Sequence, residues 1–125
     1  MSEVFNTPIY TIPPDIKDEE IANILRRVAS GESKPQLINP SHSWGETYAG
    51  NVGFLVEGWK IVVFNDCDSW DYIDSVVSPD GRTWDYSQWY QTHPNYNTDL
   101  PVTPPEGFLS SNEFERMVGA FEAAK

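Results

Sequence analysis

The spacing of hydrophobic residues near the start of the chain predicts an amphipathic helix from about Asp15 to Ala29. Its apolar side chains recur at i, i+3, i+4 and i+7, on one helical face: Ile21, Ile24, Leu25 and Val28. Acidic residues fill the first turns, Arg26 and Arg27 lie in the last, and Gly31 is expected to end the helix. This arrangement of charges matches the helix dipole, so we interpret the arginines as surface charges rather than as a binding patch.

The middle of the chain predicts an antiparallel sheet of about four strands. The strand candidates, rich in Val, Ile, Phe and Trp, are Gln36–Ile38, Val52–Glu57, Trp59–Phe64 and Tyr72–Val77. Gly58 predicts a tight hairpin between the second and third candidates. The Pro- and Gly-containing residues 78–82 predict a second hairpin, which returns residues 83–84 beside residues 76–77. Residues 39–50 are expected to form a loop.

Further elements are predicted before and after this sheet. Residues 8–14 contain three prolines and are expected to be extended, with three of their side chains docked as an edge strand: Ile9, Tyr10 and Ile12. Asp85 or Ser87 is expected to start a short helix that runs to about residue 90. Residues 92–107, with four prolines, are expected to form a wrapping loop.

A capping box predicts the last helix, because Ser110 and Glu113 have its spacing. The apolar stripe of that helix is Phe114, Met117, Val118 and Phe121. A length of 125 residues suits one core, and the aromatic content of 14% can fill it. The sequence therefore predicts a single α+β domain over residues 1–125, with an antiparallel sheet and helices near both ends.

Net charge is the strongest global signal. The chain has 19 acidic and 8 basic side chains, a formal net charge of -11. Such a field repels nucleic acid and anionic membranes, and it speeds encounter with basic partners. Residues 46–85 alone carry eight acidic and two basic side chains, which leaves six net negative charges there. Solubility alone is the simpler interpretation, but this distribution favours a basic protein partner over nucleic acid or a membrane.

The expected compartment is the cytoplasm. No apolar run approaches the roughly 20 residues that span a bilayer, and the first residues lack the pattern of a signal peptide. Cys67 is the single cysteine, which excludes an intramolecular disulfide.

The most informative segment is residues 64–74, where four aspartates alternate with large aromatic side chains. Dense negative charge beside Trp and Tyr is typical of surfaces that bind a cationic protein. The predicted partner-binding residues are Asp66, Asp68, Trp70, Asp71, Tyr72 and Asp74. The alternative is that Trp70 and Tyr72 are cross-strand core residues and that the aspartates only solvate a sheet edge.

Catalytic and cofactor chemistry is weakly indicated. No nucleophile motif surrounds Cys67, so we interpret it as a small, partly buried residue at a strand end rather than as a partner of His42 or His93. The aspartate spacing departs from the EF-hand pattern at its sixth and twelfth positions, and zinc motifs are absent. No catalytic residue, cofactor or metal is therefore predicted, although weak calcium or magnesium binding stays open. A small enzyme that uses paired carboxylates is a third alternative.

Several short motifs resemble a family of small uncharacterised bacterial proteins. They are residues 24–31 (ILRRVASG), 64–68 (FNDCD), 71–72 (DY) and 78–82 (SPDGR). The resemblance covers roughly residues 20–90 and implies no activity. In size, acidity and lack of a catalytic motif, the chain is also similar to bacterial toxin-immunity proteins, including those of contact-dependent inhibition and colicin systems.

The predicted function is therefore to neutralise a cationic protein, most concretely a nuclease toxin, by stoichiometric binding. An active site that holds phosphate is basic, and an acidic aromatic surface can occupy it. The alternative is an acidic adaptor or regulator unrelated to toxins. No enzymatic activity is expected.

Overall fold

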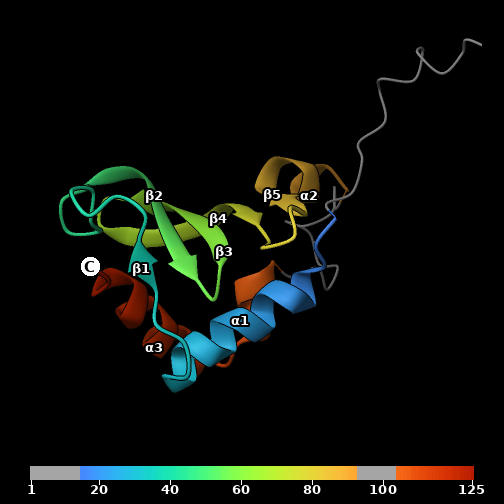
Figure 1. The fold of residues 1–125 in the computed structure, drawn as a ribbon, viewed down its shortest axis with the longest axis horizontal. Coiled ribbons are helices and arrows are strands. Elements are labelled where there is room, and N and C mark those ends of the chain that lie inside the picture. Colours follow the sequence, from blue (N-terminus) through green and yellow to red (C-terminus); the bar gives the residue numbers. More distant parts are fainter. Residues whose placement is uncertain (1–14, 93–103) are drawn as a thin grey trace, which may run out of the picture.

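Five strands form one antiparallel sheet in sequential order in the computed structural model, which describes residues 15–92 and 104–125 (Figure 1). The strands are β1 (Gln36–Leu37), β2 (Ala49–Val56), β3 (Trp59–Asp66), β4 (Ser69–Val77) and β5 (Thr83–Asp85). The α+β prediction is confirmed. The sheet has five strands rather than about four because the expected return after residue 82 pairs with the end of β4 as a strand of its own.

Two helices cover one face of the sheet. They are α1 (Asp18–Ser30) and α3 (Ser111–Glu122), and they pack against each other beneath the strands in Figure 1. A short α2 (Tyr86–Thr92) follows β5, and a 3-10 turn, η2 (Pro105–Phe108), leads into α3. The predicted capping box of α3 is confirmed, since the Ser110 hydroxyl accepts from the Glu113 amide at 3.1 Å.

The first helix starts three residues after Asp15. The Lys17 amide precedes it and donates to the Glu20 carboxylate at 3.0 Å, whereas the Asp15 amide donates to the Thr83 carbonyl at 2.9 Å. Asp15 therefore ties the chain to β5, and Lys17 is the residue that precedes the helix. Gly31, with a φ of 87°, ends the helix as predicted.

Both arginines of the last turns of α1 are used within the fold. Arg27 donates twice to the Glu57 carboxylate, at 2.7 and 2.9 Å, and so ties α1 to the β2–β3 turn. Arg26 donates to the Phe108 carbonyl at 2.8 Å and so holds η2. Both guanidinium groups therefore hold α1 to other parts of the fold.

The β2–β3 and β3–β4 hairpins both close with two residues of positive φ. Glu57 and Gly58 have φ values of 54° and 83°, and Cys67 and Asp68 have 53° and 67°. This left-handed pair is the turn that matches the twist of antiparallel strands. Cys67 is exposed at the tip of its turn, so the expectation of a partly buried cysteine is wrong.

The core lies between the sheet and the two covering helices. The rings of Phe54 on β2 and Phe121 on α3 meet edge to face with centroids 4.8 Å apart. The four predicted core residues of α1 are buried, as are Met117 and Phe121 of α3. Three predicted features lie outside the described residues: the edge strand with Ile9, Tyr10 and Ile12, most of the wrapping loop, and His93.

Candidate functional site: an acidic aromatic pocket

The candidate site begins at two irregularities in β4. Residues 64 and 65 of β3 pair with Tyr72 and Trp70, which leaves Asp71 as an extra residue without a partner on β3. A second register shift leaves Asp74 unpaired in the same way. Each extra residue changes the face to which the following side chain points. Trp70 therefore lies on the helix-covered face and Tyr72 on the opposite face, although a regular strand would put both on one face.

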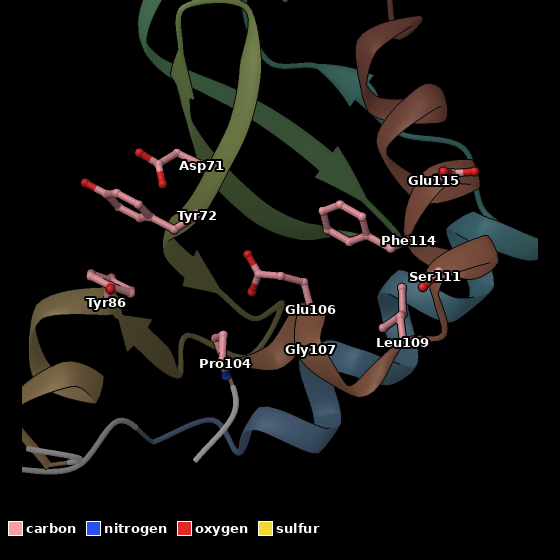
Figure 2. A pocket seen from close by; sticks show the side chains of 10 residues that line it. All are labelled: Asp71, Tyr72, Tyr86, Pro104, Glu106, Gly107, Leu109, Ser111, Phe114 and Glu115. Carbon is pink, nitrogen blue, oxygen red and sulfur yellow. The ribbon is translucent and has the colours of Figure 1, made fainter. Parts of the chain in front are cut away.

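A pocket of about 660 Å³ lies where η2 and the start of α3 approach β4 and α2 (Figure 2). Its lining residues are Asp71, Tyr72, Tyr86, Pro104, Glu106, Gly107, Leu109, Ser111, Phe114 and Glu115. Three of them are carboxylates and three are aromatic rings. The β5 strand pairs only with residues 75–77, so within the described residues the earlier part of β4 has no strand on this side. The volume lies within the range of about 300–1,000 Å³ that is usual for ligand sites.

Glu106 projects from η2 into this space (Figure 2). Its Oε2 accepts a hydrogen bond from the Trp70 indole Nε1 at 3.0 Å. Desolvation raises the pKa of Glu106, and the negative charge of Asp18 adds to that rise. The Trp70 hydrogen bond and backbone hydrogen bonds at Glu106 and Ile73 oppose it. The carboxyl at the centre of the pocket is therefore shifted toward its protonated form.

A row of stacked rings forms one wall. Phe64 stacks on Tyr72 at 5.4 Å, and Tyr72 stacks on Tyr86 at 4.4 Å, so the row connects β3, β4 and α2. Burial raises the pKa of the Tyr72 hydroxyl, and the charges of Asp74 and Asp71 raise it further. The stacked rings form a stiff wall beside the negative charges of the pocket.

The described cationic side chains do not neutralise the pocket. All eight lysines and arginines of the chain fall in the described ranges: Lys17, Arg26, Arg27, Lys34, Lys60, Arg82, Arg116 and Lys125. Ion pairs join Arg27 to Glu57, and Arg82 to Glu20 and Asp80. Within residues 15–92 and 104–125, no ion pair reaches a carboxylate of the pocket. The negative charge there is available to a ligand.

Comparison with protein families gives one match. A family model described as a domain of unknown function (DUF7693) covers residues 15–123. The chain belongs to this family. Comparison of the DUF7693 chain with curated proteins and with solved structures found no match. Membership agrees with the resemblance to an uncharacterised family, and the likeness to toxin-immunity proteins stays a prediction.

Five of the six predicted binding residues of this DUF7693 domain fall into three environments. Asp66 and Asp68 are exposed at the tip of the β3–β4 hairpin. Asp71 and Tyr72 line the pocket. Asp74 is half-buried at the second irregularity, where burial and the charge of Asp85 raise its pKa. Of the six predicted binding residues, only Asp71 and Tyr72 line this pocket.

Trp70 is half-buried: it packs against the core and also lines a second pocket, of about 390 Å³, together with Asp68. Its ring packs against Trp44, Phe114 and Phe121 with centroid distances of 6.2, 6.2 and 5.2 Å. Its indole N–H holds Glu106 from behind the pocket. The alternative interpretation of Trp70 as a packed residue describes this position, whereas Tyr72 lies on the other face of the sheet.

Sequence reasoning missed the part of the pocket that comes from the C-terminal third of the chain. Glu106, Leu109 and Glu115 were not named as candidates, and Phe114 only as a residue of the apolar stripe. Pro104 and Pro105 before Glu106 indicate a turn, but no local pattern distinguishes Glu106 from other surface acids. Only the tertiary approach of η2 to β4 reveals it.

The other candidate chemistry of the DUF7693 domain does not gather at this pocket. The His42 ring Nε2 lies 3.0 Å from the Asn51 carbonyl, on the loop before β2. No group of three or more His, Cys, Asp or Glu side chains in residues 15–92 and 104–125 could hold a metal ion. None of the helices formed by these residues is long and apolar enough to cross a membrane.

Proposed function

We propose that this domain binds and neutralises a basic protein, most concretely the nuclease domain of a toxin, through the pocket and the acidic hairpin beside it. The observation that supports the proposal is the pocket itself. Three carboxylates and three aromatic rings converge there, and no ion pair among the described residues reaches these carboxylates. Interfaces between proteins favour aromatic anchors, and carboxylates that lose water against Arg or Lys supply affinity and specificity.

The overall charge supports the same partner. A net charge of -11 accelerates encounter with a basic surface and opposes binding to nucleic acid. A nuclease active site is basic because it holds phosphate, and an acidic surface with stacked rings can occupy it in place of the substrate. An immunity role of this kind places the domain in the cytoplasm of the bacterial cell that it protects.

The test first identifies the partner protein and then measures whether the domain inhibits it. The domain, tagged and expressed in its native host, is cross-linked to its partner, and the partner is identified and purified. We expect a basic protein whose nuclease activity falls to zero at one equivalent of the domain. Asp71→Asn should weaken binding by about tenfold or more, because a desolvated charge pair is lost. Glu19→Gln, which removes the same charge from an exposed position on α1, should bind like the wild type.

The outcomes separate the alternatives. Tight binding without inhibition would indicate an acidic adaptor rather than an immunity protein. A partner that binds Asp71→Asn and Glu115→Gln as tightly as the wild type would show that the pocket is not the interface, and the proposal would then be wrong.

The same pocket supports one second candidate, a small glycosidase. Glu106 has a raised pKa, as a general acid requires, and Asp71 lines the same cavity beside rings that could stack on a sugar. Hydrolysis of aryl glycosides that is lost in both Glu106→Gln and Asp71→Asn would favour this candidate. We rank it second because the surplus negative charge extends to the hairpin tip, where it has no role in such a reaction.

A further inference from the structure

We infer that the pocket receives the guanidinium group of an arginine side chain on the basic partner, with Glu106 as its central ligand. The inference rests on the proposed function and names the chemistry by which the partner is recognised. Glu106 projects into the cavity between Tyr72 and Phe114, which come from different elements (Figure 2). The ligand would therefore enter a preformed space rather than a flat surface.

The surroundings of Glu106 favour binding of a cation from another molecule. This residue is half-buried, and its hydrogen bonds come from the neutral Trp70 indole and from the backbone at Ile73 and Glu106, so none of them supplies a counter-charge. The nearby arginines bond elsewhere, Arg26 to the Phe108 carbonyl at 2.8 Å and Arg116 to the Ala29 carbonyl at 3.3 Å. A desolvated carboxylate without a counter-charge is unfavourable, so folded proteins pair such a group or leave it protonated. A bound cation would supply the missing partner.

A guanidinium group fits these surroundings better than an ammonium group. Its flat face can stack on the ring of Phe114, which meets the Trp70 ring edge to face, and its weak hydration makes desolvation cheaper. A carboxylate has about four lone-pair sites on its two oxygens, so Glu106 can accept from a ligand in addition to its bonds to Trp70 and the backbone. The planar array of five N–H donors can also reach a second carboxylate, and Asp71 lines the same cavity.

Arginine binding should be linked to proton release. The groups that face or act on Glu106 are Asp71 and Tyr72 on β4, Tyr86 on α2, Glu115 on α3 and Asp18 on α1, none of which is cationic. The guanidinium stabilises the ionised carboxylate, so it lowers the pKa of Glu106 from its raised value in the free protein. Affinity should therefore fall as the pH drops through that raised pKa, and binding near that pH should release a proton.

The test uses small probes on the whole chain. N-acetyl-arginine amide, N-acetyl-lysine amide and N-acetyl-citrulline amide are titrated into the labelled protein and followed by NMR. We expect the arginine probe to bind with a dissociation constant of about 1 mM, since ligands of this size gain roughly 0.3 kcal/mol per heavy atom. Shifts should centre on the Glu106, Phe114 and Tyr72 amides. The lysine probe should bind at least about fivefold more weakly, and uncharged citrulline should not bind.

Variants decide whether Glu106 is the ligand. Glu106→Gln keeps an acceptor for the Trp70 indole, so its spectrum should show a retained fold, but arginine affinity should fall at least about tenfold. Glu19→Gln is the matched control and should leave affinity unchanged. Calorimetry in two buffers of different ionisation enthalpy should detect the released proton for the wild type and not for Glu106→Gln.

Failure of this inference and failure of the proposed function give different results. Equal binding of the lysine and arginine probes, or wild-type affinity in Glu106→Gln, would overturn the arginine assignment. If Asp71→Asn still weakens binding of the partner protein, the proposed function stands without the arginine assignment. If the probes do not bind and neither pocket variant changes partner affinity, both proposals are wrong.

Discussion

Asp18 is the residue whose substitution tests the fold most directly. It lies in the first turn of α1, and its two carboxylate oxygens accept from two indoles: Oδ1 from Trp84 Nε1 at 3.0 Å and Oδ2 from Trp89 Nε1 at 2.7 Å. Trp84 and Trp89 are each only 1% exposed. One carboxylate thus joins α1 to β5 and to α2, which contributes Tyr86 to the pocket.

Asp18→Ala should destabilise the domain by about 3 kcal/mol. Each hydrogen bond to a charged group contributes about 1.5–3 kcal/mol, and two are lost here. Because Asp18 is half-buried, water can replace part of the loss, so we expect the low end of the sum. Asp18→Asn keeps one carbonyl acceptor but turns an amide donor toward the second indole. It should lose about half as much, roughly 1.5 kcal/mol.

Urea denaturation followed by tryptophan fluorescence measures these changes, and the melting temperature of Asp18→Ala should fall by about 10 °C. Glu19→Ala is the control, because Glu19 lies in the same turn, is exposed, and has a side chain that makes no hydrogen bond to another described residue. It removes the same helix-dipole interaction and should cost no more than about 0.5 kcal/mol. If Asp18→Ala costs no more than Glu19→Ala, the two indole bonds do not stabilise the fold and this reasoning is wrong.

Three further predictions concern the acidic residues and the turn between β3 and β4. Glu106→Gln should gain stability relative to the wild type as the pH rises above the ordinary pKa of 4.5, by up to about 1.4 kcal/mol per pH unit, because the raised folded-state pKa of Glu106 contributes stability that the wild type loses as the pH rises through it. Denaturation at pH 4 and pH 8 measures the difference in unfolding free energy between the two proteins, and the same difference at both pH values would contradict the prediction. Cys67→Val should cost about 1–2 kcal/mol in thermal melts, since a β-branched residue disfavours a φ of 53°, whereas Cys67→Asn should be nearly neutral. The double variant Asp66→Asn, Asp68→Asn should slow association with the partner at low salt but not at 1 M salt, where the screening length is about 3 Å; a slower rate at both salt concentrations, measured by stopped flow, would point to direct contact instead.

The helices and hairpins of this fold could be predicted because local rules specify them. Ser110 and Glu113 define the start of α3 within one turn of chain, and Gly58 and Gly81 supply the positive φ that their turns require. The apolar stripes of α1 and α3 fix which face each helix buries. None of these features depends on contacts between distant parts of the chain.

The faces of β4 could not be predicted, because two extra residues interrupt its alternation. In a regular strand Trp70 and Tyr72 would point the same way, and the sequence contains no signal that Asp71 is unpaired. A β-bulge is visible only once the partner strand is in place. The sequence therefore predicts one surface from these six residues, although they separate into a hairpin tip, a pocket wall, a half-buried position and, for Trp70, a place packed behind the pocket.

The pocket depends even more on tertiary structure. Glu106 is separated from Trp70 by 36 residues, yet the two side chains are hydrogen-bonded. Its raised pKa follows from burial against β4, which no sequence pattern around residue 106 indicates. Composition alone predicts that the protein is acidic. Which carboxylates line the pocket depends on how the elements pack.

One physical argument connects the bulges, the pocket and the proposed arginine. Because Asp71 is an extra residue, Trp70 turns inward and can place its indole behind Glu106, while Tyr72 turns outward and stacks in the ring wall. A regular β4 would present either two rings to the core or two rings to solvent, and Glu106 would lose either its hydrogen-bond donor or its aromatic neighbour. The irregular strand supplies both at once. The acidic residue that breaks the alternation is therefore also the one that adds a second carboxylate to the cavity, which is the arrangement that a planar cation with several donors can use.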